Sequence, residues 1–339
     1  MASLFWLQGK RPAFFLDDSI HNVGIATLVY IIPKTRVVAF IFRLRERKMP
    51  TLPHLIANAK IKWLSRSLSI QQFRAVTASD IDGNAILKNF SELLGGNTEY
   101  EYICTPEYRA WHLIRSPHST HTIMYVHGGG FVSGSSSSVT SYLLQLHLEL
   151  AARGLVSDMV AVEYDLAPEY PYPHALRQIV SAYEYVRAQS KPIVLMGDSA
   201  GGNLCLALLR HLVYPHPQIQ PSRSSRNASE GITAACLASP WVDLRERSIS
   251  DAKAPWDCLD VTALKSWRDA YLGTRPVDEY TSALGMASPK WNDILPPKML
   301  LMSGDLDLFL AQIKSLADEI KNVRHTLPPI KKKPKKNKK

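Results

Sequence analysis

The stretch IVLMGDSAGGNLCLALL, at residues 193–209, places a single serine between glycines where an apolar run ends and a helical pattern begins. The run IVLM has the composition of a buried strand, and NLCLALL repeats its apolar residues with helical spacing. Gly197, Ser199 and Gly201 form a G-x-S-x-G pattern at this junction. A strand, a sharp turn that carries a serine, and a helix make a nucleophile elbow. The stretch therefore predicts an α/β fold with Ser199 as a nucleophile, and the alternative is an ordinary turn that uses glycine for packing.

A second glycine motif, HTIMYVHGGGF at residues 121–131, ends another apolar run in three glycines. A glycine run of this kind frees backbone N–H groups to face a developing oxyanion. By itself it is equally typical of a flexible loop or a phosphate cradle. No GK[ST] follows it, and the context of a dinucleotide-binding G-x-G-x-x-G is missing. Together with GDSAGG, the motif predicts an oxyanion hole.

From about residue 99 onward, short apolar runs alternate with helical patterns. This alternation predicts a mostly parallel central sheet with helices on both faces. The expected strands lie in EYEYICT, RAWHLIR, HTIMYV, DMVAVEYDLAP, PIVLMGD, ITAACLASPWVDL and KMLLMSGD, and the expected helices are SYLLQLHLELAARG and the segments 174–189, 199–214 and 310–322.

Composition divides the chain into three parts. Residues 1–75 mix apolar and basic segments and are expected to form an N-terminal cap or a membrane-associating segment. Residues 76–330 are expected to form the α/β core, and the Trp-rich segment 245–292 within it is expected to be a helical cap insertion. Residues 331–339 are expected to be a disordered lysine-rich tail.

The net charge of +10 belongs mostly to that tail, which holds seven lysines and leaves the body at +3 (10 minus 7). No basic face interleaved with aromatic residues is visible, so no nucleic-acid partner is expected. The four cysteines are widely spaced and are expected to be reduced packing residues. Histidine and cysteine spacings of metal sites are missing, so neither a metal nor a cofactor is expected.

The N-terminal part of the chain shows no convincing secretion signal. Its apolar runs at residues 25–32 and 37–42 are each shorter than the roughly 20 residues that span a bilayer. Basic residues follow at 43–48, so residues 20–48 are expected either to contact a membrane peripherally or to pack in the cap. The chain is therefore expected in the cytoplasm, with membrane association as the alternative.

Four blocks carry a family resemblance: HGGGF at 127–131, EYDLAPEYPYPHAL at 163–176, GDSAGGN at 197–203 and SPWVDL at 239–244. In their order and spacing they resemble the hormone-sensitive-lipase-like branch of the α/β-hydrolase superfamily. The resemblance implies a capped α/β-hydrolase fold with an oxyanion hole formed by the backbone N–H groups of Gly129, Gly130 and Ala200. The chain departs from the family at Asp165, where arginine is frequent.

A serine nucleophile needs a histidine base and a carboxylate to orient it, and α/β hydrolases carry them in the order serine, acid, histidine. The segment SGDLDLF at 303–309 offers Asp305 and Asp307. The family pattern G-x-x-D, counted from Gly304, selects Asp307 and leaves Asp305 as a turn residue. The alternative is that both are ordinary polar residues closing a strand.

His325 is the one histidine after Asp307 and is therefore the candidate base. It follows the acid by 18 residues (325 minus 307), whereas the family usually has about thirty, with a helix and a final strand between them. The final strand and its histidine loop are therefore expected to be missing or altered. Two explanations stay open: His325 reaches the site on a short loop, or the end of the sequence is truncated or replaced by KKKPKKNKK.

The sequence thus predicts a carboxylic-ester hydrolase that acts on apolar or medium-chain esters through a serine acyl-enzyme, with activity impaired by the atypical C-terminus. The alternative is a catalytically inactive ligand-binding protein on the same scaffold, as in the plant gibberellin receptors, which resemble this family and lack its histidine. A membrane-associated deacetylase of lipids would share the chemistry and differ in location.

Overall fold

A computed structural model describes residues 52–77, 99–135, 137–222, 231–245, 257–284 and 291–325. Its centre is a seven-stranded sheet with the order β1-β2-β4-β3-β5-β6-β7. The strands are β1 (Glu99–Cys104), β2 (Arg109–Arg115), β3 (His121–Val126), β4 (Ser157–Glu163), β5 (Ile193–Asp198), β6 (Ile232–Ala238) and β7 (Lys298–Met302). Strand β2 pairs antiparallel with β1 and β4, and the pairs from β4 to β7 are parallel. The predicted mostly parallel sheet is confirmed.

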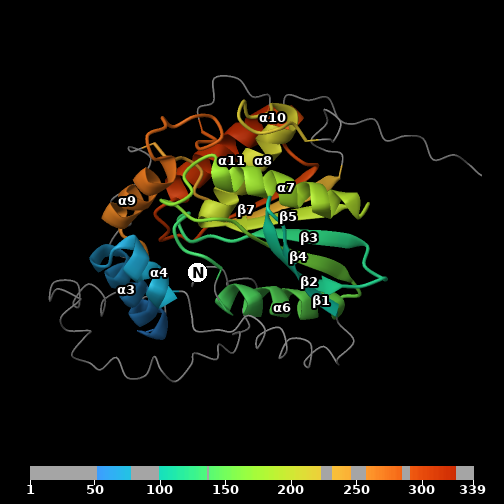
Figure 1. Cartoon of the computed structure of the whole chain (residues 1–339), viewed down its shortest axis with the longest axis horizontal. Helices are drawn as coiled ribbons and strands as arrows, with labels where there is room; N and C mark the ends of the chain where they lie inside the picture. The colour runs from blue at the N-terminus through green and yellow to red at the C-terminus, as the bar shows by residue number, and fades with distance from the viewer. Residues whose placement is uncertain are drawn as a thin grey trace, which may run out of the picture.

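Helices cover both faces of the sheet, as predicted (Figure 1). Helix α6 packs on one face with side chains of β2, β3 and β4, and α7, α8 and α11 pack on the other. The described helices are α3 (Leu52–Ser67), α4 (Ile70–Thr77), α6 (Ser137–Ala151), α7 (His174–Ala188), α8 (Ser199–Val213), α9 (Val261–Leu272), α10 (Trp291–Ile294) and α11 (Leu310–His325). None of these helices is long and apolar enough to cross a bilayer.

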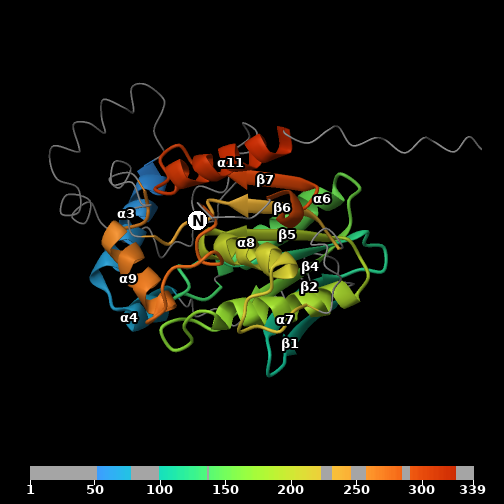
Figure 2. The same cartoon turned by 90° about the horizontal axis from the view of Figure 1, so that it is seen from above.

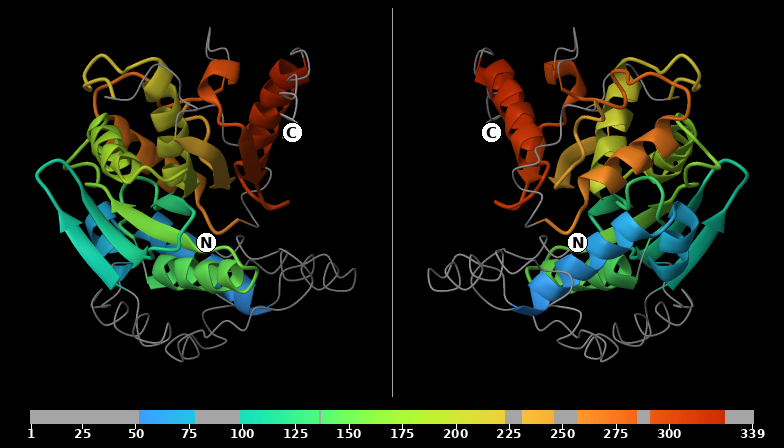
Figure 3. Two further views of the ribbon diagram at one scale, coloured as in Figure 1. Left: turned by 90° about the vertical axis from the view of Figure 1, so that its right-hand side faces the viewer. Right: turned by 90° about the vertical axis from the view of Figure 1, so that its left-hand side faces the viewer.

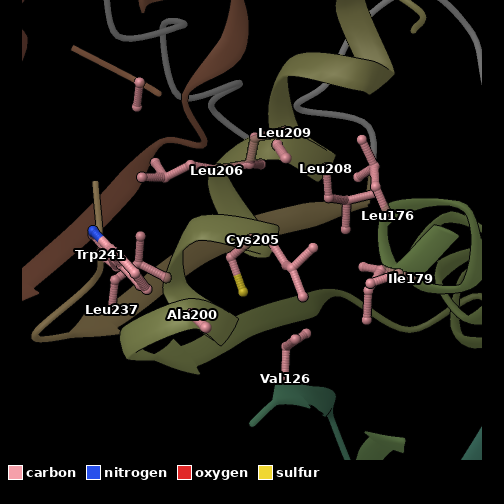
Figure 4. Close-up of a cluster of buried hydrophobic side chains, with 14 of the residues drawn as sticks. Val126, Leu176, Ile179, Ala200, Cys205, Leu206, Leu208, Leu209, Leu237 and Trp241 are labelled. Atoms are coloured by element: carbon pink, nitrogen blue, oxygen red, sulfur yellow. The ribbon is translucent and has the colours of Figure 1, made fainter. Parts of the chain in front are cut away.

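Helix α8 lies at the centre of the hydrophobic core (Figure 4). Every residue from Ala200 to Leu212 is buried. A helix that is apolar all round is stable when it is covered all round. Here β5 and β6 cover one side of it and α7 covers another, with Leu176 and Ile179 reaching toward Leu208 and Leu209. The apolar continuation of the GDSAGG motif therefore fixes the turn at the centre of the molecule.

Nearly all residues of the central strands β3 and β4 are buried, as a parallel sheet covered on both faces requires. Strand β7 differs, because it is the last strand of the sheet and its residues alternate between exposed and half-buried. The side chain of Leu300 in this strand is 50% exposed. Within the described ranges no strand follows β7, and the expected loss or alteration of a final strand stays a prediction because residues 326–339 lie outside those ranges.

Helices α3, α4 and α9 gather beyond the end of the sheet toward which β6 and β7 point (Figure 2). Helix α4 begins with a capping box, in which the Ser69 hydroxyl accepts the Gln72 N–H and the Gln72 side chain accepts the Ser69 N–H. The insertion 245–292 is helical only in part, because its described residues 273–284 form turns and a single bridge between Asp243 and Ser282. Residues 1–51 and the predicted tail lie outside the described residues, so the domain division stays a prediction.

Asp165, the residue that departs from the family pattern, holds a small polar network. Its carboxylate accepts hydrogen bonds from Arg109 (2.6 Å), from the His174 Nε2 (2.9 Å) and from the Gln178 amide (2.8 Å). Burial by itself would raise the pKa of Asp165, but the hydrogen bonds from His174 and Arg109 hold that pKa below its usual value. The network joins β2 to α7, so the departure affects packing around the sheet and leaves the predicted site residues untouched.

Candidate active site

Ser199 is the first residue of α8 and directly follows β5. Its φ of +49° lies in the left-handed region, which is strained for a residue with a side chain. Such a conformation persists where the surrounding structure over-determines it, and it is common at functional sites. The Ser199 carbonyl accepts a hydrogen bond of 2.9 Å from the Trp241 N–H, and its side chain is only partly buried. The predicted strand, sharp turn and helix are present.

Close packing explains why glycine flanks this serine. A Cβ atom on Gly197 would lie 2.8 Å from the Cys205 Sγ and 2.8 Å from the Gly201 carbonyl oxygen, distances that real Cβ atoms do not show. A Cβ on Gly201 would overlap the carbonyl oxygens of Val126 and His127. The start of α8 therefore rests directly on the end of β3. The glycine-packing explanation and the nucleophile-elbow explanation of this motif are both compatible with the geometry.

The glycine motif after β3 forms a tight left-handed turn. Gly129, Gly130 and Phe131 have φ values of +109°, +62° and +65°. The Gly129 carbonyl accepts hydrogen bonds from the N–H groups of Val132 (3.1 Å) and Ser133 (2.9 Å). Left-handed backbone disfavours a Cβ atom. At Gly129 and Gly130 an added Cβ would also collide with neighbouring atoms, so both positions require glycine. Two backbone hydrogen bonds to the Gly129 carbonyl therefore close the turn.

Asp198 joins the glycine loop to the elbow. Its Oδ1 accepts hydrogen bonds from the Gly128 N–H (3.0 Å) and from the Tyr125 hydroxyl (2.5 Å). Asp198 is the N-cap residue of α8, but its side chain makes no capping hydrogen bond. Burial, followed by the Asp198 charge, raises the pKa of Tyr125 well above its ordinary value, so its hydroxyl stays a donor. Sequence reasoning missed this residue, and the one available signal was its position beside Ser199.

His127 is buried and supports the same loop. Its ring stacks on the Tyr164 ring with centroids 4.2 Å apart, and the Tyr164 hydroxyl donates to the His127 carbonyl at 2.9 Å. Burial lowers the pKa of His127, which favours the neutral ring. The Nδ1 of that ring lies 2.6 Å from the Gly128 carbonyl oxygen, a geometry that assigns the proton to Nδ1. His127 is therefore occupied in holding the loop.

Asp307 and Asp305 follow β7, but the structure treats them differently. Asp305 is exposed and Asp307 is buried. One Asp307 oxygen accepts the Phe309 N–H at 2.7 Å and the other accepts the Ser303 hydroxyl at 3.1 Å. The Ser239 hydroxyl is a further hydrogen-bond partner of the same carboxylate.

The segment after β6 brings the Asp307 turn close to the elbow. Ser239 is hydrogen bonded to Asp307, and two residues later the Trp241 N–H bonds the Ser199 carbonyl. The Trp241 ring also stacks on Phe309, with centroids 5.5 Å apart. The carboxyl ends of β3, β5, β6 and β7 therefore bring the glycine loop, Ser199 and Asp307 to one edge of the sheet. Ala200, in the first turn of α8, is buried at the same edge.

The structure carries His325 away from this edge. Helix α11 begins three residues after Asp307 and runs without a break to His325. At 1.5 Å per residue, it carries the backbone about 22 Å along its axis. Figure 2 shows α11 running opposite to β7, and Figure 3 shows it, in red, extending away from α3 and α4. One explanation from the sequence was that His325 reaches the site on a short loop. In the structure the residues up to His325 are helical, so no such loop precedes it.

The described residues show neither a histidine bound to Asp307 nor a metal site. No histidine in the described part of the chain is hydrogen bonded to Asp307, whose partners there are Ser239, Ser303 and Phe309. Across the same ranges, no group of three or more histidine, cysteine, aspartate or glutamate side chains is arranged to hold a metal ion.

The buried carboxyl of Asp307 gives a pH-dependent stability prediction. Burial raises its pKa above the ordinary value, although hydrogen bonds from Ser239 and the Phe309 N–H oppose the shift. A group with a raised folded-state pKa contributes stability below its unfolded pKa, and loses that contribution as pH rises through the folded pKa. Asp307→Asn should therefore gain free energy of unfolding relative to the parent chain as pH rises from 3 to 7.

Urea denaturation at several pH values measures this difference. Asp305→Asn is the matched control, because it removes an exposed carboxyl two residues away. If the pH profile of Asp307→Asn runs parallel to that of Asp305→Asn, the burial of Asp307 has no electrostatic cost and the prediction is wrong.

Comparison with known proteins adds to this geometry. Residues 123–328 match a family model described as the alpha/beta hydrolase fold. Hormone-sensitive lipase of Mus musculus is 30% identical over 215 residues, which are 59% of this chain and 24% of that protein. An esterase of Acinetobacter venetianus is 30% identical over 208 residues, 59% of this chain and 61% of that protein. An acetyl-hydrolase of Streptomyces hygroscopicus is 31% identical over 194 residues, 54% and 56% of the two chains.

A solved esterase of the bacterial hormone-sensitive lipase family superposes with a TM-score of 0.56 at 23% identity. The superposition covers 81% of this chain and 86% of that one, and at this identity it speaks for the fold. The chain spans less than two thirds of the length of the three curated relatives.

Proposed function

Because the chain belongs to the α/β-hydrolase fold family, on its hormone-sensitive-lipase-like branch, we propose that it hydrolyses carboxylic esters. One observation carries this proposal: the strained Ser199 elbow is tied through the Asp198 carboxylate to the glycine loop. An ordinary strand-to-helix turn needs neither a partly exposed serine in left-handed backbone nor a second glycine loop fixed beside it.

The proposed reaction follows from these groups. The Ser199 Oγ attacks the ester carbonyl, and the N–H groups of Gly129, Gly130 and Ala200 donate to the oxyanion that forms. The tetrahedral intermediate collapses, the alcohol leaves with the proton that the Ser199 hydroxyl gave up to the base, and Ser199 holds the acyl group. Water then attacks the acyl-enzyme and releases the carboxylic acid, which restores the serine. The positive end of the α8 dipole at Ser199 also favours the negative charge.

Asp307 is the proposed acid that orients a histidine base. By chain order that base is His325, which ends α11, whereas Asp307 lies three residues before the start of that helix. This separation favours a second candidate function, the binding of an apolar ligand without turnover. An oxyanion hole retains part of its catalytic effect when the base is lost. The hydrolase and the ligand-binding protein would therefore share this site and differ in the rate at which they hydrolyse an ester.

Aromatic side chains of the cap suggest the substrate class. The Trp267 ring of α9 lies against Gly130, where an added Cβ would overlap it. Phe73 of α4 contacts the same ring with centroids 5.2 Å apart. An apolar wall beside the proposed oxyanion hole supports an uncharged, apolar acyl group, as in the apolar or medium-chain esters that the sequence predicts. The names of the relatives, an esterase and an acetyl-hydrolase, are compatible with this class.

Turnover of p-nitrophenyl acetate and butyrate by the 339-residue chain tests the proposal, together with labelling by a fluorophosphonate. Turnover, with a single label that maps to Ser199, is the result expected of the hydrolase. Labelling without turnover indicates a nucleophile that lacks its base, and His325→Ala then has no effect. Absence of both turnover and label contradicts the hydrolase and leaves the binding protein.

Residues 20–48 lie outside the described residues, and their peripheral contact with a membrane is a separate proposal. Flotation with anionic vesicles, compared between the full chain and a chain that lacks residues 1–48, measures it. Equal flotation of the two chains would show that these residues do not contribute a membrane contact.

A further inference from the structure

Arg74 of α4 bridges two loops at the predicted site. Its Nε donates to the Val132 carbonyl at 2.6 Å, and its Nη2 donates to the Ala167 carbonyl. The outer edge of the guanidinium also pairs with both oxygens of Glu169, at 3.0 and 2.8 Å. Val132 follows the glycine loop directly, and Ala167 lies in the loop after β4. One planar side chain therefore satisfies carbonyl groups from two separate segments.

The loop that Arg74 contacts is the one with three successive positive φ angles, at Gly129, Gly130 and Phe131. Phe131 is fully buried and stacks on Tyr271, with ring centroids 3.7 Å apart. Its carbonyl accepts the Ala167 N–H at 3.0 Å. A strained loop of this kind keeps one conformation only while its neighbours hold it. At the C-terminal end of the loop, the Ala167 N–H and the Arg74 guanidinium donate the hydrogen bonds that fix the backbone.

The rest of α4 reinforces the contact. Phe73 packs on Trp267, the ring that lies against Gly130. One turn further, the Thr77 Oγ1 lies 3.0 Å from the Ser133 Oγ. The face of α4 that carries residues 73, 74 and 77 therefore rests on the glycine loop and its continuation. Within that face, Arg74 makes the contacts to the loop backbone itself.

We propose that Arg74 is a positioning residue for the oxyanion hole, which fixes the N–H groups of Gly129 and Gly130 relative to Ala200. The proposal rests on the function proposed above. The guanidinium acts through the Val132 and Ala167 carbonyls, and does not touch the substrate. Lysine cannot replace it fully, because an ammonium group lacks the planar fork that serves two carbonyls and a carboxylate together.

The two kinds of contact that Arg74 makes are separable. The Glu169 side chain is 46% exposed, and exposed ion pairs contribute little. Glu169→Gln removes the charge of the partner and keeps both carbonyl contacts, so it should behave nearly as the parent chain. Arg74→Ala removes all of them. Arg66→Ala is the matched control, because Arg66 is an exposed arginine in the last turn of the neighbouring α3.

The first measurement is hydrogen exchange of the backbone amides at residues 128–133, detected by mass spectrometry. In Arg74→Ala these amides should exchange about 10-fold faster or more, while α8 keeps its protection. Arg74→Lys should give an intermediate value, and Arg66→Ala and Glu169→Gln should match the parent. Loop exchange in Arg74→Ala equal to that of the parent overturns the proposal.

The rate of Ser199 phosphonylation by a fluorophosphonate is the second measurement, because that reaction also forms an oxyanion. In Arg74→Ala the limiting rate should fall about 10-fold to 100-fold, with the half-saturating concentration unchanged. Faster loop exchange with an unchanged limiting rate makes Arg74 a structural residue only and overturns the proposal. If the parent chain is not labelled, the proposed hydrolase function is wrong. The exchange data still show in that case whether Arg74 fixes the glycine loop.

Discussion

Ser199→Ala should lower turnover of p-nitrophenyl acetate by at least about 1000-fold relative to the parent chain. The reason is chemical, because alanine removes the atom proposed to form the acyl-enzyme while the proposed oxyanion hole stays in place. Residual hydrolysis would come from water in the site and would show no rapid release of the first equivalent of p-nitrophenol. Steady-state rates and the amplitude of the initial burst measure both effects.

A second serine of the chain provides the control. Ser190 is exposed and has a φ of +58°, close to the +49° of Ser199. Ser190→Ala therefore changes a hydroxyl to hydrogen in nearly the same backbone conformation, outside the predicted site. It should keep the activity of the parent chain. Comparable turnover in Ser199→Ala and the parent would mean that another group performs the hydrolysis.

Much of the fold was predictable because local patterns in this chain agree with the tertiary structure. The run IVLM and the apolar helix after Ser199 became β5 and α8, with the boundary at the serine itself. Parallel strands buried on both faces produce continuous apolar runs, which are readable without structural data. The resemblance carried by four motifs, from HGGGF to SPWVDL, was confirmed by the family match and the curated relatives.

The parts that sequence reasoning missed depend on contacts between distant residues. Arg74 and Val132 are 58 positions apart, and Arg74 and Ala167 are 93 positions apart. The sequence patterns of α3 and α4 give no reason to distinguish Arg74 in α4 from the exposed Arg66 in α3. Asp198 stood beside the serine, but an aspartate before a helix ordinarily predicts a cap, and its side chain bonds the glycine loop instead. In each case the partner is fixed only after the sheet has formed.

The prediction for His325 depended on the length of the last helix. The expected end of that helix was near residue 322, which left a short segment free to turn back toward Asp307. The structure continues α11 to His325. Helix ends are uncertain by a few residues in any sequence-based reading, since fraying and capping are decided locally. The longer helix places this histidine in the last turn of α11, at the end of the helix farthest from Asp307.

Gly201→Ala should destabilise the chain by about 3 kcal/mol, in the range of overpacked cores. In an open helix the same change stabilises by about 1 kcal/mol, because glycine is a poor helix former. Here the added Cβ would overlap the Val126 and His127 carbonyl oxygens. Those oxygens belong to the backbone at the end of β3, which the parallel ladders with β4 and β5 hold in place. Urea denaturation measures the difference.

Gly134→Ala is the control for this change, because a Cβ there meets its nearest neighbour, a Leu166 methyl, at 4.0 Å. It should change the free energy of unfolding by less than about 0.5 kcal/mol. If Gly201→Ala were as stable as Gly134→Ala, α8 would have to move away from β3. That movement would separate Ser199 from the glycine loop, so labelling of Ser199 by the fluorophosphonate should slow even in a variant that folds. A variant that is both stable and fully reactive would show that close contact between α8 and β3 is not what positions the serine.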